Sequence, residues 1–113
     1  MAKRYRYIAL VNAAPGKDDE FNEWHTHTHM QEVLDATGFE YSQRLRLVPG
    51  TSGEGEKYGY LITMEIETDD PQGVMARMGA AVESGEIGLS DTLAPPTWAG
   101  LFEEIPGARK EHT

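Results

Sequence analysis

Alternation of apolar and polar residues in several short stretches is the feature that most restricts the fold of this chain. Residues 39–48 and 58–67 alternate along their length, and residues 4–11 alternate in part. Side chains on a strand point to opposite faces in turn, so each stretch predicts a β-strand. Residues 85–96 are predicted to be an irregular segment, and residues 97–105 the last strand. The glycine-rich residues 49–57 are expected to form a mobile, dispensable hairpin loop.

Two helical patterns separate these strands. Residues 20–34, with the sequence EFNEWHTHTHMQEVL, have helix-forming flanks and end before Gly38, a common helix stop. Asp18 or Asp19 is expected to cap the start of this helix. The second helix is predicted at residues 71–83, where apolar residues recur every three or four positions.

The resulting order, β-α-β-β-α-β, predicts an α+β fold of the ferredoxin-like type. Its four-stranded antiparallel sheet would have both helices on one face. The other face would expose Tyr and Ile side chains, so we expect a homodimer in which two sheets close on each other as a dimeric α/β barrel. Residues 1–105 would form this single domain and residues 106–113 a C-terminal tail.

Composition limits the partners and the location. The 113 residues carry a formal net charge of −9, which argues against a nucleic-acid partner because phosphate binding needs clustered Lys and Arg. No apolar run approaches the length of a membrane helix, so no membrane partner is expected. The chain has no Cys, which excludes disulfides and thiolate sites and suits a cytoplasmic location.

The histidine-rich segment carries the candidate chemistry. On a helix, His25, His29 and Glu32 share a face while His27 points roughly the other way. An imidazole has a pKa near 6.5, so His29 could act as a general acid/base, with Glu32 or His25 orienting it. The competing interpretation is a structural histidine that is partly buried or caps a carbonyl.

The same spacing also fits a metal site. His25 and His29 are separated by four residues, as in helical zinc, copper or nickel sites, and Glu32 could supply a third ligand. This alternative requires one divalent transition metal. Two solvated histidines on a charged helix face would give the same pattern without any site.

Five groups of residues form one set: Glu20-Phe21-Asn22-x-Trp24, His29, Glu32-Val33-Leu34, Gly38-Phe39 and Gln43-Arg44. Together they resemble the EthD-like family of the dimeric α/β-barrel superfamily. This resemblance implies a ferredoxin-like fold, a dimer joined sheet to sheet, and a pocket between sheet and helices for an apolar or aromatic substrate. It also implies an acid/base role for His29. The chain departs from the family after Trp24, where residues 25–27 replace an aromatic residue followed by Asp and Asn, so any role of that Asp does not carry over.

We therefore predict a small enzyme of the lyase, isomerase, cyclase or monooxygenase type that uses no cofactor. Its substrate would be an apolar or aromatic, polyketide-like carbonyl compound. The alternative is a non-catalytic dimeric module that holds a small molecule, or a metal at His25 and His29. Substrate contacts are assigned to Trp24, Tyr7, Tyr60 and Arg44, of which Arg44 is placed on the polar face of its strand.

Overall fold

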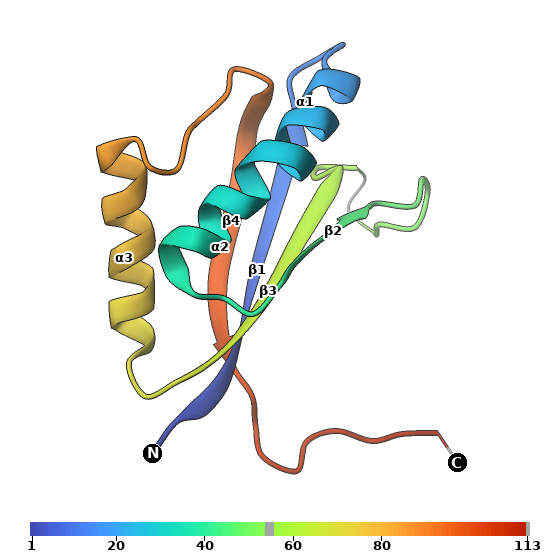
Figure 1. Ribbon diagram of the computed structural model, residues 1–113. Helices are drawn as coiled ribbons and strands as arrows, with labels where there is room; N and C mark the ends of the chain where they lie inside the picture. Colours follow the sequence, from blue (N-terminus) through green and yellow to red (C-terminus); the bar gives the residue numbers. More distant parts are fainter. Residues whose placement is uncertain (54–55, 113) are drawn as a thin grey trace.

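A computed structural model describes residues 1–53 and 56–112 and confirms the ferredoxin-like order of elements. A long bent helix, made of three segments, and a second helix lie on one side of a twisted sheet (Figure 1). The elements are β1 (Lys3–Ala13), α1 (Asp18–Trp24), η1 (His25–His29), α2 (Met30–Thr37), β2 (Ser42–Arg46), β3 (Tyr60–Thr68), α3 (Pro71–Ser84) and β4 (Leu93–Glu103).

The sheet is antiparallel, with the strand order β2-β3-β1-β4. Tyr7 in β1 lies opposite Met64 in β3 and Leu101 in β4, so these three side chains share the face that the helices cover. Phe21 of α1 and Val74 of α3 are almost fully buried against that face. The core therefore lies between the sheet and the helices, where burial of apolar surface stabilises the fold.

Strand β2 presents the opposite face from the one predicted. Arg44 pairs with Ile62 and lies on the helix side of the sheet, whereas Leu45 pairs with Leu61 on the open side. The placement of Arg44 on the solvent-facing side of its strand is therefore wrong. The strand is also shorter than residues 39–48, because Phe39 turns into the core ahead of β2.

Strand β4 begins at Leu93, four residues before the predicted start of the last strand. Pro95 and Pro96 lie inside it, and they favoured an irregular segment in the sequence. Because β4 pairs only with β1 and forms an edge of the sheet, it can include prolines that donate no hydrogen bond. Part of the predicted hairpin loop, residues 54–55, lies outside the described residues.

Of the two predicted ends of the first helix, only the C-terminal end at Gly38 agrees with the structure. Lys17, rather than an aspartate, occupies the position before α1, and no side chain caps this terminus. Asp18 instead accepts a hydrogen bond from the Tyr60 hydroxyl at 2.7 Å. Gly38 ends α2 with φ +83°, a left-handed conformation that glycine adopts without a Cβ penalty.

The open face of the sheet carries an apolar patch and a polar network. The expected Tyr and Ile side chains lie mostly on the helix side instead, as for Tyr5 and Ile66 in the core. Among the side chains exposed on the open side, Trp98 and Phe102 pack together with ring centroids 6.0 Å apart. The apolar patch comprises Leu10, Leu45, Leu61, Trp98 and Phe102.

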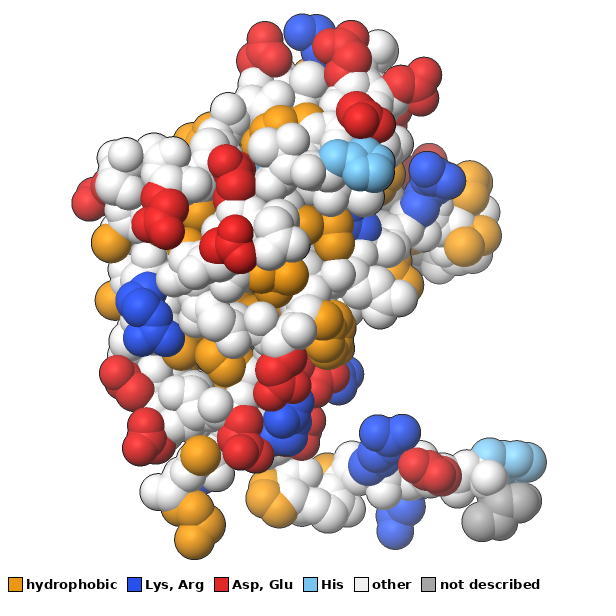
Figure 2. All heavy atoms as spheres, in the orientation of Figure 1, with side chains coloured by type: hydrophobic (Ala, Val, Ile, Leu, Met, Phe, Trp, Pro, Cys, Tyr) orange, Lys and Arg blue, Asp and Glu red, His pale blue; other side chains and the backbone are white. Residues whose placement is uncertain are grey.

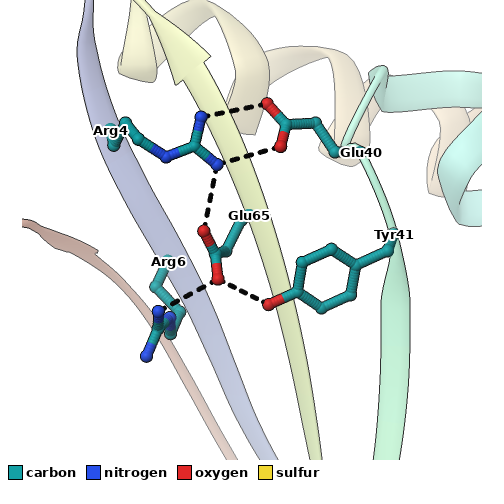
Figure 3. A network of polar contacts seen from close by, with 5 residues as sticks. All are labelled: Arg4, Arg6, Glu40, Tyr41 and Glu65. Atoms are coloured by element: carbon teal, nitrogen blue, oxygen red, sulfur yellow. Dashed lines mark hydrogen bonds and ion pairs between the residues drawn. The ribbon is translucent and has the colours of Figure 1, made fainter.

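At one end of the open face, Glu65 accepts hydrogen bonds from three side chains (Figure 3). The Tyr41 hydroxyl donates at 2.6 Å, and Arg4 and Arg6 each donate at 3.0 Å. Arg4 also pairs with Glu40, so each charge in this network has an opposite neighbour.

In the part of the chain that the structure describes, no helix combines the length and apolar character needed to span a membrane.

Candidate functional site

The histidine segment is helical, as predicted, but its middle is a π-helical turn. Residues 25–29 form η1, in which backbone hydrogen bonds reach five residues back and the helix widens. In an α-helix, residues four apart drift by about 40° around the axis. The wider turn offsets this drift. Phe21, His25 and Val33 are all buried, and His29 lies on the same side of the helix between His25 and Val33.

A cavity of about 190 Å³ lies between this helix row and the sheet. Its walls come from β1, β3, both helices and the segment before β4, and the described lining residues include no Asp, Glu, Lys or Arg. Leu89 and Val82 are exposed and form part of its rim. Figure 2 shows apolar side chains reaching the surface on this helix side, with acidic side chains around them. The aromatic and polar side chains of its lining are Tyr7, Trp24, His25, His29 and Ser42.

His29 lies between this cavity and solvent, with 17% of its side chain exposed. Its ring stacks on Trp24 at a centroid distance of 4.5 Å. Nδ1 is 3.9 Å from Glu32 Oε1, which is beyond hydrogen-bond distance, and it has no hydrogen-bond partner among the described residues. Burial lowers the pKa of His29, while the Glu32 charge and the Gly88 backbone act in the opposite direction. His29 is thus a neutral base near pH 7.

Glu32 does not line the cavity, but it is held beside His29. Its Oε1 accepts a hydrogen bond from the Gly88 backbone N–H at 3.2 Å. This bond ties α2 to the segment after α3 and fixes the carboxylate next to the imidazole. A carboxylate in this position stabilises a positive charge that forms on His29.

His25 is buried, with 5% exposure, and packs its ring edge-on against Phe21 and His29 at centroid distances of 5.2 and 5.0 Å. Burial lowers the pKa of His25 to about 3, and the charges of Arg44 and His29 act in the same direction. The side chain is therefore neutral throughout the physiological range. His27, in contrast, is exposed and lies near Glu23, away from the cavity.

The alternative explanation of the spacing, two solvated histidines on a charged helix face, does not agree with the structure, since both side chains line the cavity. The metal alternative stays a prediction. Among residues 1–53 and 56–112, no group of three or more His, Asp or Glu side chains is placed to hold one metal ion. A metal at His25 and His29 would need its other ligands from outside this set.

Of the four predicted substrate contacts, the structure places two at the cavity and two beside it. Tyr7 and Trp24 line the cavity. Tyr60 and Arg44 instead support α1: the guanidinium lies 5.2 Å from the Tyr60 ring and donates to Asn22 and Thr26. They therefore position the histidine helix, and Arg44 adds a positive charge behind His25.

Sequence reasoning missed Ser42 and much of the apolar wall. Ser42 begins β2 opposite Met64, and its Oγ is buried without a hydrogen-bond partner among the described residues. The register of β2 with β3 would have revealed it, because its partner Met64 belongs to the core. Ile87, Leu89 and Leu93 come from the segment predicted as irregular, and only the tertiary structure brings them to the cavity.

The fold is shared with several solved structures. An EthD family protein from Bacillus halodurans is similar with a TM-score of 0.58 and 20% identity, over 93% of this chain and 100% of that one. A heme-degrader, MhuD, from Mycobacterium tuberculosis is similar with a TM-score of 0.63 and 20% identity, over 93% and 99% of the two chains. A dimeric ferredoxin-like protein of unknown function from Thermobifida fusca gives a TM-score of 0.57 and 15% identity, over 92% and 93%.

These likenesses define the class of fold, a ferredoxin-like unit that this chain shares with those solved proteins. No protein-family profile matches the chain, and no curated protein matches it in sequence. The functions of the neighbours vary, and one of them was solved with two hemes bound in its active site.

Proposed function

We propose that this protein is a cofactor-independent enzyme that moves a proton on an apolar or aromatic carbonyl compound, with His29 as the general acid/base. One observation carries this proposal: a neutral, partly exposed imidazole lies at the mouth of an apolar cavity with a carboxylate beside it. A base that must exchange protons with water and also reach a bound substrate needs this placement.

The step follows from the groups present. His29 takes a proton from the carbon next to the substrate carbonyl, the C–H bond breaks, and its electron pair moves onto the carbonyl oxygen as an enolate. Glu32 stabilises the imidazolium that forms. His29 then returns the proton to the same or another carbon of the enolate, after exchanging it with water through its exposed edge where the two are in contact. No electrons are gained or lost in this step.

Tyr7 is the best-placed residue to polarise the carbonyl. It lines the cavity on the sheet side, and burial raises its pKa, so the hydroxyl stays protonated near neutral pH. A protonated hydroxyl in an apolar site can donate a hydrogen bond to the developing enolate. His29 on the helix side and Tyr7 on the sheet side would then contact the two ends of the reacting C–C=O unit.

The test uses a reaction that does not depend on knowing the final product. A panel of enolisable aryl ketones is incubated with the protein in deuterated water, and proton NMR follows loss of the α-proton signal. The wild-type protein should accelerate exchange for at least one member. His29→Gln should slow it by about 10²–10⁴, the usual range for loss of a general acid/base.

His27→Gln is the matched control, because His27 is exposed two positions away on the same turn. It should leave the exchange rate unchanged. If wild type and His29→Gln exchange every ketone at the same rate, the acid/base role is refuted. Circular dichroism of both variants would confirm that they remain folded.

The proposal includes a homodimer formed through the open sheet face. Trp98 and Phe102 expose about half of their surface there, at 44% and 51%, and a second copy would cover them. The similar Thermobifida fusca protein is described as dimeric. Light scattering should give close to twice the chain mass of 12.6 kDa. Leu45→Glu, which places a charge in the apolar patch, should give a folded monomer, whereas a wild-type monomer at micromolar concentration would refute this arrangement.

A further inference from the structure

The cavity holds two polar groups that the proposed proton transfer does not use. Nδ1 of His25 and Oγ of Ser42 are buried, and neither has a hydrogen-bond partner among the described residues. Both residues line the same cavity, His25 from the helix and Ser42 from the start of β2. Buried polar groups without partners cost free energy, so such groups are uncommon and call for an explanation.

A bound molecule with its own polar atom would supply the missing partner. Both side chains can either donate or accept a hydrogen bond, since a hydroxyl and a neutral imidazole each have both capacities. Together they suit an oxygen that is neutral, such as a hydroxyl or a carbonyl. The apolar walls, with no charged residue among the described lining, disfavour a carboxylate at the same point.

The size of the cavity limits the body of the ligand. An engineered apolar cavity of about 150 Å³ holds benzene. The present cavity of about 190 Å³ therefore accommodates one six-membered ring with a small substituent, and anything longer must pass the exposed rim near Leu89. His29 lies at the exposed side and His25 at the buried side of this space.

We infer that the pocket binds a neutral single-ring molecule whose hydroxyl or carbonyl oxygen, at its buried end, is held by His25 and Ser42. This inference rests on the proposed function, because it names the substrate class of the same pocket. It assigns His25 and Ser42 to binding, whereas the acid/base role belongs to His29. The buried oxygen sets the depth and orientation of the ring, and this orientation determines which carbon faces His29.

Three probes that share an ethylbenzene skeleton test the inference by calorimetry: ethylbenzene, para-ethylphenol and para-ethylbenzoate. The wild-type protein should bind para-ethylphenol at least as tightly as ethylbenzene, and para-ethylbenzoate most weakly. Ser42→Ala should weaken para-ethylphenol by about 2- to 12-fold, the effect of one hydrogen bond, and leave ethylbenzene unchanged. This variant should fold, since it removes a buried group that has no partner.

His25→Phe is the second variant, because it keeps an aromatic ring in contact with Phe21 and removes the polar atoms. This variant should also weaken the binding of para-ethylphenol and of no other probe. The inference is refuted if both variants bind para-ethylphenol as wild type does, if none of the probes binds, or if the benzoate binds best. His29→Gln separates the two proposals: it should slow proton exchange as stated above, yet bind all three probes as wild type does.

Discussion

Replacing His25 with Phe should remove a large part of the acid sensitivity of the fold. His25 is 5% exposed, and burial lowers its pKa from an ordinary value of 6.5 to about 3. Between these two values the unfolded chain binds a proton at this position and the folded chain does not. Stability therefore falls as the pH falls through this window, and it is unaffected by His25 above it.

The magnitude follows from the width of the window. A pH of 5 lies about 1.5 units below the ordinary pKa of the unfolded side chain. Each pH unit below that pKa removes about 1.4 kcal/mol from the free energy of unfolding. The wild-type protein should thus lose about 2 kcal/mol more than His25→Phe in its free energy of unfolding between pH 7 and pH 5. Any folded pKa well below 5 gives nearly the same figure, so the result depends on burial and not on the exact pKa.

Urea denaturation at pH 7 and pH 5, followed by circular dichroism, measures this difference directly. Comparing each protein with itself at the two pH values cancels the effect of the added ring on packing. His27→Gln should keep the wild-type pH dependence. Equal losses for wild type and His25→Phe would show that folded His25 takes up a proton as readily as the unfolded side chain, and would refute its burial as a neutral group.

Four further substitutions have expected outcomes that thermal and urea denaturation can check. Gly38→Ala should lower the free energy of unfolding by about 1–2 kcal/mol, because φ is +83° at this position. Gly79→Ala should raise it by up to about 1 kcal/mol, because Gly79 lies inside α3 with open space around it. A loss of stability at Gly79 would contradict this account. Asp70→Ala should cost about 1 kcal/mol, since Asp70 caps α3 by accepting from the Gly73 N–H at 3.0 Å, and an unchanged melting temperature would show that this cap adds nothing. Hydrogen bonds from Tyr41 and Arg4 lower the pKa of Glu65 to about 2, so Glu65→Gln should be less stable than wild type at pH 7. The difference should shrink as the pH falls towards 2, and one that stays constant would contradict the role of the charge.

The fold could be predicted from the sequence because each element carries its own local pattern. The period-two alternation of β3 and the Gly38 stop both agree with the structure. The facing of β2 could not be predicted in this way. Its open side is also apolar, with Leu45 opposite Leu61, so alternation alone does not reveal which side faces the core. Arg44 was misplaced for this reason.

The site was predicted less well, because it depends on contacts between distant segments. The spacing of His25, His29 and Glu32 identified residues that do lie together. It gave no information on whether they face water or the core, since an amphipathic pattern with histidines fits either. Ser42 and the wall from residues 87–93 join the cavity only through tertiary packing, and no local pattern marks them.

The π-helical turn also accommodates one residue more than an α-helical turn of the same rotation. If the same residues closed into a continuous α-helix, everything after the turn would rotate by about 100° relative to Phe21. His29, Glu32 and Val33 would then leave the sheet side together, and the imidazole would move away from the cavity without any change to the chemical groups of the site. The widened turn thus acts as a phase adjustment that keeps the two halves of the helix facing the same pocket.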